Sequence, residues 1–143
     1  MNQTSVETTK NKNLPHAERR DVAKTEYLDG RIVTKPTANR WHNMIATNFT
    51  VAVGSRIHRS TCELYANDMQ VRIGKSSICF PDVVVVNGEP AFADESSQLL
   101  INPTVVIEIF SSIAKSTDRQ QKLEGFLAIP KIKECLLVNE NEM

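Results

Sequence analysis

The sequence predicts a single domain of the α/β or α+β class, in which helices flank a central mixed β-sheet. Its 143 residues and hydrophobic fraction of 41% fall in the range of one globular domain with its own core. Apolar runs of strand length alternate with two longer segments of helical periodicity. Short glycine-containing turns allow antiparallel pairing of the early strands, and a long crossover over 111–132 favours parallel pairing of the last two.

The first part of the chain predicts a tail, a hairpin and a long helix. Residues 1–13 are polar and are expected to form a flexible tail ahead of a domain over 14–143, which a weak helix over 16–24 opens. The pair Asp29-Gly30 predicts a hairpin turn that leads into a strand. Apolar residues three and four positions apart over 39–58 predict an amphipathic helix, with Asn39 as its cap.

The second part predicts the remaining strands and a second helix. Residues 63–73 nearly alternate and predict a half-buried strand, broken by the polar pair Asn67-Asp68. Residues 78–86 and 104–109 are almost wholly apolar and predict strands covered on both faces. A helical turn is expected over 94–100. Ser116 opens a helix that reaches about residue 128, where Pro130 stops it, and 134–139 is the last strand.

Composition and charge exclude several classes of protein. The formal net charge is zero, so a nucleic-acid partner requires a local basic face. The three cysteines are far apart and form no C-x-x-C pair, which argues against zinc and redox motifs and favours reduced thiols in a cytoplasmic protein. No run of about 18 apolar residues is present, and the polar N-terminus lacks the apolar core of an export signal, so neither a membrane span nor export is expected.

Two carboxylates inside apolar strands are the main clue to function. Asp82 and Glu108 are costly to bury unless positive charge meets them, and Lys122 follows. If the two strands are adjacent, both carboxylates can hold one Mg²⁺ or Mn²⁺ ion, which would orient a phosphodiester and activate water. The simpler alternatives are that Asp82 bonds a turn or caps a helix, and that Glu108 forms a structural ion pair.

Lys122 and several further polar residues allow two readings each. Lys122 lies four residues after Asp118, so it either forms a surface ion pair with it or stabilises charge on a phosphate. The other candidates for the site are three acidic residues in or near strands and turns, Glu26, Asp29 and Asp68, and one histidine early in the long helix, His42. Basic residues flank that helix and either grip phosphates weakly or form a solvated face: Arg56 and Arg59 at one end, and Arg31, Lys35 and Arg40 at the other.

Several motifs in order resemble a known family. They are 26–30 (EYLDG), 67–73 (NDMQVRI), 80–86 (FPDVVVV), 102–109 (NPTVVIEI) and 117–122 (TDRQQK), followed by Ile129-Pro130 and 136–138. This set resembles the Uma-two family of "putative restriction endonucleases", abundant in cyanobacteria and part of the PD-(D/E)xK nuclease-like superfamily. The resemblance covers roughly residues 25–140.

The resemblance implies a restriction-endonuclease-like αβββαβ core and a magnesium-dependent endonuclease that acts on DNA. Asp82 then corresponds to the aspartate of the PD element and Glu108 to the acidic residue of the (D/E)xK element. Phe110 stands where the lysine of that element would be, so the lysine is expected from a D-x-x-x-K pattern that Asp118 and Lys122 match. His42 and Asp68 match positions that are commonly polar in the family.

The chain also departs from the family pattern. It has Arg31 after Asp29-Gly30 where an acidic residue is common, and no proline after the Glu108 strand. Relatives continue past the last strand, so the domain is expected to be short at its C-terminus, with an exposed sheet edge that favours dimerisation or instability. A homodimer is expected because two sites suit two DNA strands.

Two other functions stay open. One is a non-catalytic, degenerate module that binds nucleic acid or a protein partner. The other is a structural domain in which both carboxylates pair with Lys122.

Overall fold

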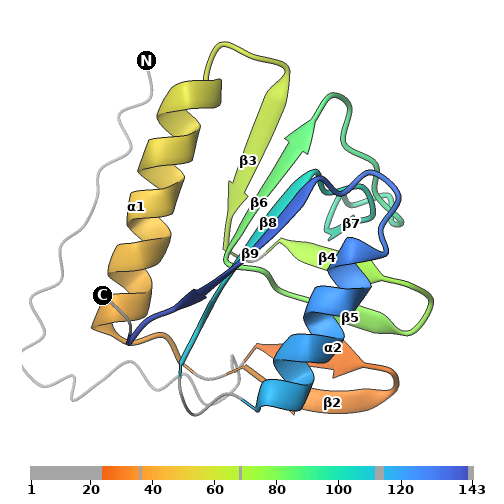
Figure 1. Cartoon of the computed structure of the whole chain (residues 1–143). Coiled ribbons are helices and arrows are strands. Elements are labelled where there is room, and N and C mark those ends of the chain that lie inside the picture. Colours follow the sequence, from red (N-terminus) through yellow and green to blue (C-terminus); the bar gives the residue numbers. More distant parts are fainter. Residues whose placement is uncertain (1–23, 36, 68, 112–114, 142–143) are drawn as a thin grey trace, which may run out of the picture.

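The computed structural model describes residues 24–35, 37–67, 69–111 and 115–141 (Figure 1). The tail expected over 1–13, and all of the helix expected over 16–24 except Lys24, lie outside these residues. The helices are α1 (Arg40–Ile57) and α2 (Ser116–Leu127). The strands are β1 (Thr25–Leu28), β2 (Arg31–Thr34), β3 (Cys62–Ala66), β4 (Gln70–Ile73), β5 (Ser77–Cys79), β6 (Val83–Asn87), β7 (Leu99–Leu100), β8 (Val105–Phe110) and β9 (Glu134–Asn139).

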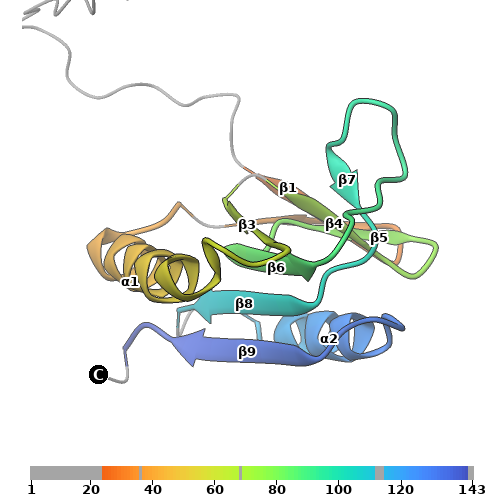
Figure 2. The ribbon, with the colours of Figure 1, turned by 90° about the horizontal axis from the view of Figure 1, so that it is seen from above.

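The described strands form two sheets, and Figure 2 shows β6, β8 and β9 of one of them side by side. The first has the order β2-β1-β5-β4-β7, and the second has the order β3-β6-β8-β9. In the second sheet β6 pairs antiparallel with β3 and β8, whereas β8 pairs parallel with β9 through the α2 crossover. The elements α1, β3, β6, β8, α2 and β9 follow in this order, so the predicted αβββαβ core with a mixed sheet is confirmed.

Local sequence explains the elements that were predicted well. Asp29 and Gly30 both have positive φ, as the hairpin turn between β1 and β2 requires. The Asn39 side chain accepts a hydrogen bond of 2.9 Å from the His42 amide and caps α1. The last strand has the predicted bounds, and α2 ends at Leu127, before Pro130.

Three elements differ from the sequence prediction. The strand expected over 78–86 is two strands in different sheets, because Pro81 cannot donate a hydrogen bond and the chain leaves one sheet at Cys79 and joins the other at Val83. The strand expected over 63–73 is likewise β3 and β4. Residues 94–100 form no helical turn, since Asp94 accepts hydrogen bonds from the amides of Gln98 and Leu99 and competes with helix formation.

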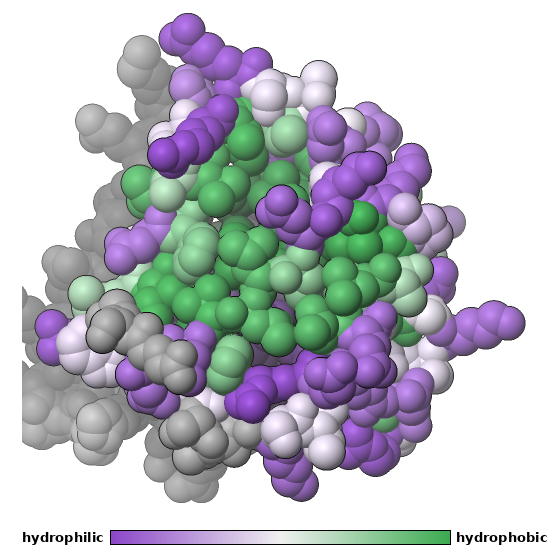
Figure 3. All heavy atoms as spheres, viewed as in Figure 1, coloured by the Kyte–Doolittle hydropathy of each residue, from purple (hydrophilic) through white to green (hydrophobic). Residues whose placement is uncertain are grey.

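The main core lies between the two sheets and α2. It includes Leu28, Val71, Val84, Val106 and Phe126, all at most 1% exposed. A smaller cluster of Ile45, Ala46 and Ile109 attaches α1 to the second sheet. Apolar side chains also remain on the surface of the molecule. Figure 3 shows them gathered over α1 and the strands between the helices. Met44 and Val51 of α1 and Leu137 of β9 are exposed.

Candidate active site at the junction of the two sheets

The register of β6 and β8 brings the two candidate carboxylates together. Val83 is paired with Ile107, and the Asp82 amide donates to the Ile107 carbonyl at 3.1 Å. Continued by one residue, this antiparallel register puts Asp82 opposite Glu108. The adjacency of the two strands, on which the sequence argument depended, is therefore confirmed. Both side chains are buried, with 2% and 6% of Asp82 and Glu108 exposed.

Asp82 is held from three sides. Its Oδ2 accepts a hydrogen bond of 2.8 Å from the Ile109 amide, and its Oδ1 lies 2.7 Å from Nε2 of His42 and 3.3 Å from Nζ of Lys35. Burial alone would raise the pKa of Asp82, but the His42 hydrogen bond, the charge of Lys35 and the Ile109 amide together hold it below the ordinary value. The carboxylate is therefore ionised and available to a cation.

Lys122 lies between two other buried carboxylates. Its Nζ is 3.0 and 3.1 Å from the oxygens of Glu26 and 2.7 Å from Oε1 of Glu108. Burial would lower the pKa of this ammonium, but the charges of Glu108 and Glu26 outweigh burial and raise it. Lys122 is buried because α2 turns it and Phe126, four residues on, towards the same side.

Glu26 fixes the neighbouring loop as well as Lys122. Its Oε1 also accepts a hydrogen bond of 2.9 Å from the Phe80 amide, just before Pro81 and Asp82.

Glu108 contacts two cations, one with each carboxylate oxygen. Its Oε1 meets Lys122, in a contact that is ionic rather than aligned as a hydrogen bond, and its Oε2 is 4.0 Å from Nζ of Lys35.

Three oxygens converge on the ammonium of Lys35. The Phe80 carbonyl accepts from Nζ at 2.6 Å, and Asp82 Oδ1 and Glu108 Oε2 lie at 3.3 and 4.0 Å. We call these three oxygens the cradle. Carbonyl and carboxylate oxygens are the ligands that hard divalent cations prefer. The cradle thus already holds a positive charge where the sequence argument expected Mg²⁺ or Mn²⁺.

A small cavity of about 150 Å³ opens beside the cradle. Its lining includes Lys35, Asn39, His42, Glu108 and Glu140. Glu140 follows β9, and its amide donates to the carbonyl of Phe110 at the end of β8. Its Oε1 accepts a hydrogen bond of 3.0 Å from the Asn39 side chain, and its Oε2 is 3.8 Å from Nδ1 of His42. His42 therefore lies between Asp82 and Glu140.

The other predicted residues lie outside this group. Asp118 pairs with Arg31 at 3.1 Å, so it is not the ion-pair partner of Lys122. Arg40 lies over the ring of Trp41. Arg56 and Arg59 are at the other end of α1, about 20 Å from His42 along the helix axis. Asp68 lies outside the described residues.

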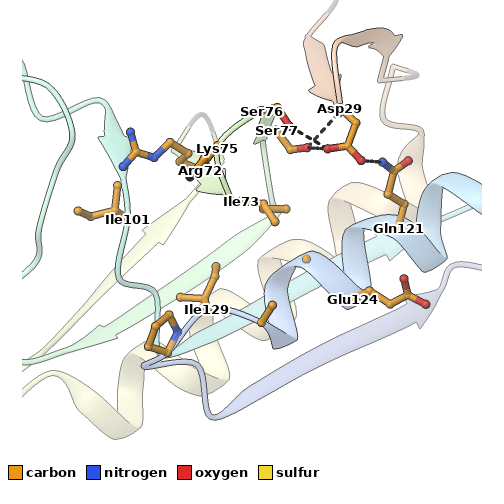
Figure 4. Close-up of a pocket in the computed structure, with 14 residues that line it drawn as sticks. Asp29, Arg72, Ile73, Lys75, Ser76, Ser77, Ile101, Gln121, Glu124 and Ile129 are labelled. Atoms are coloured by element: carbon orange, nitrogen blue, oxygen red, sulfur yellow. Dashed lines mark hydrogen bonds between the residues drawn. The ribbon is translucent and has the colours of Figure 1, made fainter.

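Asp29 has a structural role in a second, larger cavity. This cavity of about 560 Å³ lies between the β4–β5 turn and α2 (Figure 4). Asp29 accepts hydrogen bonds from Ser76 and Ser77 and from the side chain of Gln121, as the dashed lines in Figure 4 show. These contacts tie the β1–β2 turn to the β4–β5 turn and to α2, away from the cradle.

Among the residues that the structure describes, the charged groups of the site carry more negative than positive charge. The four buried carboxylates are Glu26, Asp82, Glu108 and Glu140, and the two ammonium groups are Lys35 and Lys122. Four negative and two positive charges give −2 with His42 neutral. Among the described residues, no three His, Cys, Asp or Glu side chains are grouped to ligate a metal. The cradle nevertheless fits Mg²⁺, which is commonly bound by one or two carboxylates together with water and substrate phosphate.

Sequence reasoning missed two residues of the site. Lys35 was counted only as part of a basic surface, and Glu140 was not considered. The parallel register of β9 with β8 is the signal for Glu140, because it places the residue after β9 beside the end of β8. Nothing in the local sequence of Lys35 marks it as a partner of Asp82, which is 47 residues away.

Comparison with known proteins gives a family match and two curated relatives. The sequence model of a protein family described as "Uma2: Putative restriction endonuclease" matches residues 12–142. Uncharacterized protein sll1609 of Synechocystis sp. is 32% identical over 124 residues, which cover 86% of this chain and 70% of the relative. Uncharacterized protein slr1290 of the same organism is 25% identical over 127 residues, covering 88% of this chain and 66% of the relative.

A solved structure supports the fold independently. It is described as "a putative nuclease belonging to DUF820" from Anabaena variabilis, with a TM-score of 0.68 and 21% identity over 84% of this chain and 68% of that one. None of the described helices is both long and apolar enough to cross a bilayer. The match over 12–142 shows that the chain belongs to the Uma2 family, described as putative restriction endonucleases.

Proposed function

We propose that the chain is a metal-dependent endonuclease that hydrolyses phosphodiester bonds of DNA. The observation that carries the proposal is the pairing of Asp82 with Glu108 across two adjacent strands, with an oxygen of each turned towards one cation. The excess negative charge of the site and the family of the chain support it. Asp82 Oδ1 and Glu108 Oε2 are the atoms that would hold Mg²⁺ or Mn²⁺.

The roles of the chain's own residues follow from their contacts. A bound Mg²⁺ ion supplies a Lewis acid and lowers the pKa of coordinated water. Because ionised Asp82 can only accept, Nε2 of His42 carries the proton of their hydrogen bond and fixes this carboxylate. Lys122 holds Oε1 of Glu108, which leaves Oε2 for the cation, and its buried positive charge stabilises charge that develops on a nearby phosphate.

A nicking assay tests the proposal. Supercoiled plasmid is incubated with the protein and Mg²⁺, with and without EDTA, and with the variants Asp82→Asn and Glu108→Gln. Metal-dependent nicking that both variants lose by 10²-fold or more supports the proposal. Glu89→Gln is the matched control, because Glu89 is an exposed carboxylate beyond the opposite end of β6. Nicking that survives in both variants assigns the cleavage to another site and overturns it.

A second candidate is a non-catalytic module of the same fold that binds nucleic acid or a protein. The observation that favours it is that Lys35 and Lys122 already neutralise the two central carboxylates. This alternative predicts saturable DNA or protein binding without cleavage at any concentration of Mg²⁺ or Mn²⁺. The nicking assay and a gel-shift assay on the same samples separate the two functions.

We further propose a homodimer, since cutting both strands of a duplex suits two centres related by a two-fold axis. The exposed apolar side chains of α1 and β9 offer surface for such contact. Sedimentation equilibrium at the protein concentration of the nicking assay checks this. A monomer that makes double-strand breaks would contradict it.

A further inference from the structure

We propose that Lys35 is an internal cation that occupies the metal position of the metal-free protein and moves to Glu140 when a divalent ion binds. The inference rests on the proposed function, because it assumes that the cradle is the metal site. It adds an exchange between two cations at one set of oxygens. It also gives a role to Glu140, which the proposed reaction does not use.

The cradle cannot hold both cations. Nζ of Lys35 is 2.6 Å from the Phe80 carbonyl, 3.3 Å from Asp82 Oδ1 and 4.0 Å from Glu108 Oε2. A divalent ion on the same carboxylates would lie within a few ångströms of this ammonium. At such a separation the repulsion between like charges greatly exceeds thermal energy, even at the effective dielectric constant of a protein site. Metal binding therefore requires that Lys35 leaves.

Glu140 is suited to receive the ammonium. It is 8% exposed, yet in the described part of the chain its carboxylate has a hydrogen bond only from Asn39, with His42 further away at 3.8 Å. No described lysine or arginine forms an ion pair with it. A buried carboxylate without a cation is unfavourable, and an arriving ammonium would relieve that cost.

The two positions of the ammonium border one cavity. Lys35 and Glu140 line the same cavity of about 150 Å³. One water molecule occupies about 30 Å³ in the liquid, so this cavity is several times larger than a single water molecule. The lysine side chain carries its charge on a flexible four-carbon stem. In the proposed exchange, rotation of this stem carries the ammonium from the cradle across the cavity to Glu140.

The exchange makes a specific prediction about metal affinity. If Lys35 competes with the metal, Lys35→Gln removes the competitor and tightens metal binding at least tenfold. If Glu140 receives the displaced ammonium, Glu140→Gln weakens binding in the wild-type background. The same change then has no effect in the Lys35→Gln background, where no ammonium moves. A simple field effect of the Glu140 charge would instead weaken binding equally in both backgrounds.

The experiment is calorimetric titration of Mn²⁺ into the full chain, Lys35→Gln, Glu140→Gln and the double variant. Far-ultraviolet circular dichroism confirms that each is folded, and Lys35→Met replaces Lys35→Gln if the latter does not fold. Lys131→Gln is the charge-matched control, because Lys131 is exposed in the turn after α2. The thermal midpoint of each protein, with and without Mn²⁺, is a second readout that requires no activity.

Each outcome decides between the readings. Tighter binding by Lys35→Gln, together with an effect of Glu140→Gln that is confined to the wild-type background, supports the exchange. Unchanged or weaker binding by Lys35→Gln makes Lys35 a structural counter-ion and overturns the exchange, while the metal site itself stands. An equal effect of Glu140→Gln in both backgrounds removes Glu140 as the receiving group. Absence of Mn²⁺ binding in all folded variants overturns the metal site and the exchange together.

Discussion

Replacing Lys122 by methionine should strongly destabilise the fold. Lys122 is 9% exposed and is the nearest described cation of both Glu26 and Glu108, at 2.7 to 3.1 Å. Removing one partner of a buried ion pair costs about 3–5 kcal/mol, since it leaves charge without compensation. A domain of this size is stable by only about 5–15 kcal/mol, so Lys122→Met should lose a large part of the stability of the fold.

Urea denaturation measures this loss. With a slope of about 2 kcal/mol per molar urea, a loss of about 4 kcal/mol lowers the midpoint by about 2 M. Lys131→Met, on the exposed turn after α2, should change stability by less than about 0.5 kcal/mol. Changing Glu26 and Glu108 to glutamine in the Lys122→Met background should recover part of the loss, because the expensive feature is the uncompensated carboxylate charge.

The pH dependence gives a second check. The pKa of Lys122 in the folded protein is raised above its ordinary value of 10.5, since Glu108 and Glu26 outweigh burial. A raised pKa stabilises the fold fully below the unfolded value and loses that effect only as the pH rises through the folded value. The loss caused by Lys122→Met should therefore be the same at pH 7 and pH 9. A loss below about 1 kcal/mol, or one that changes between these pH values, would show that Lys122 does not stabilise the fold by compensating the charges of Glu26 and Glu108.

Three further predictions concern packing, a turn and a thiol. A Cβ on Gly125 would lie 2.2 Å from Cγ2 of Ile73, so Gly125→Ala should lower the free energy of unfolding by about 1–3 kcal/mol. A Cβ on Gly54 meets no atom within 4 Å, so Gly54→Ala should raise the free energy of unfolding by up to about 1 kcal/mol. Equal urea midpoints for the two variants would contradict this. Hydrogen bonds, chiefly from Ser76, lower the pKa of Asp29. The thermal midpoints of wild type and Asp29→Asn should therefore differ at pH 7 and converge as the pH falls below about 3.8. A difference between the two midpoints that persists at low pH would argue against a stabilising role of ionised Asp29. Burial raises the pKa of Cys79 to about 12, so iodoacetamide at pH 8, followed by mass spectrometry, should label this thiol only after unfolding.

Local pattern was sufficient where local interactions decide the structure. Asp29-Gly30 has the residues of a tight hairpin turn, and the Asn39 side chain caps the helix that periodicity predicts. The break at Pro81 was harder to predict, because 78–86 is apolar on both sides of it. Only the pairing partners show that β5 and β6 belong to different sheets.

The site was predictable in part for the same reason. Asp82 and Glu108 stand out because a carboxylate inside an apolar strand must find a positive partner. Which partner it finds depends on contacts between distant segments. Lys122 meets Glu26 and Glu108 rather than Asp118, four residues away, because α2 packs with that side towards the sheets. Lys35 and Glu140 join the site only through the fold.

The proposed metal site is tested first by calorimetric titration of Mn²⁺ into the wild-type chain and its Asp82→Asn variant. We expect one saturable site per chain in the wild type, with binding weakened at least tenfold in the variant, which stays folded by circular dichroism. Wild-type protein that is folded and binds no Mn²⁺, or a variant that binds as tightly as wild type, would contradict the assignment of Asp82 and Glu108 as a metal site.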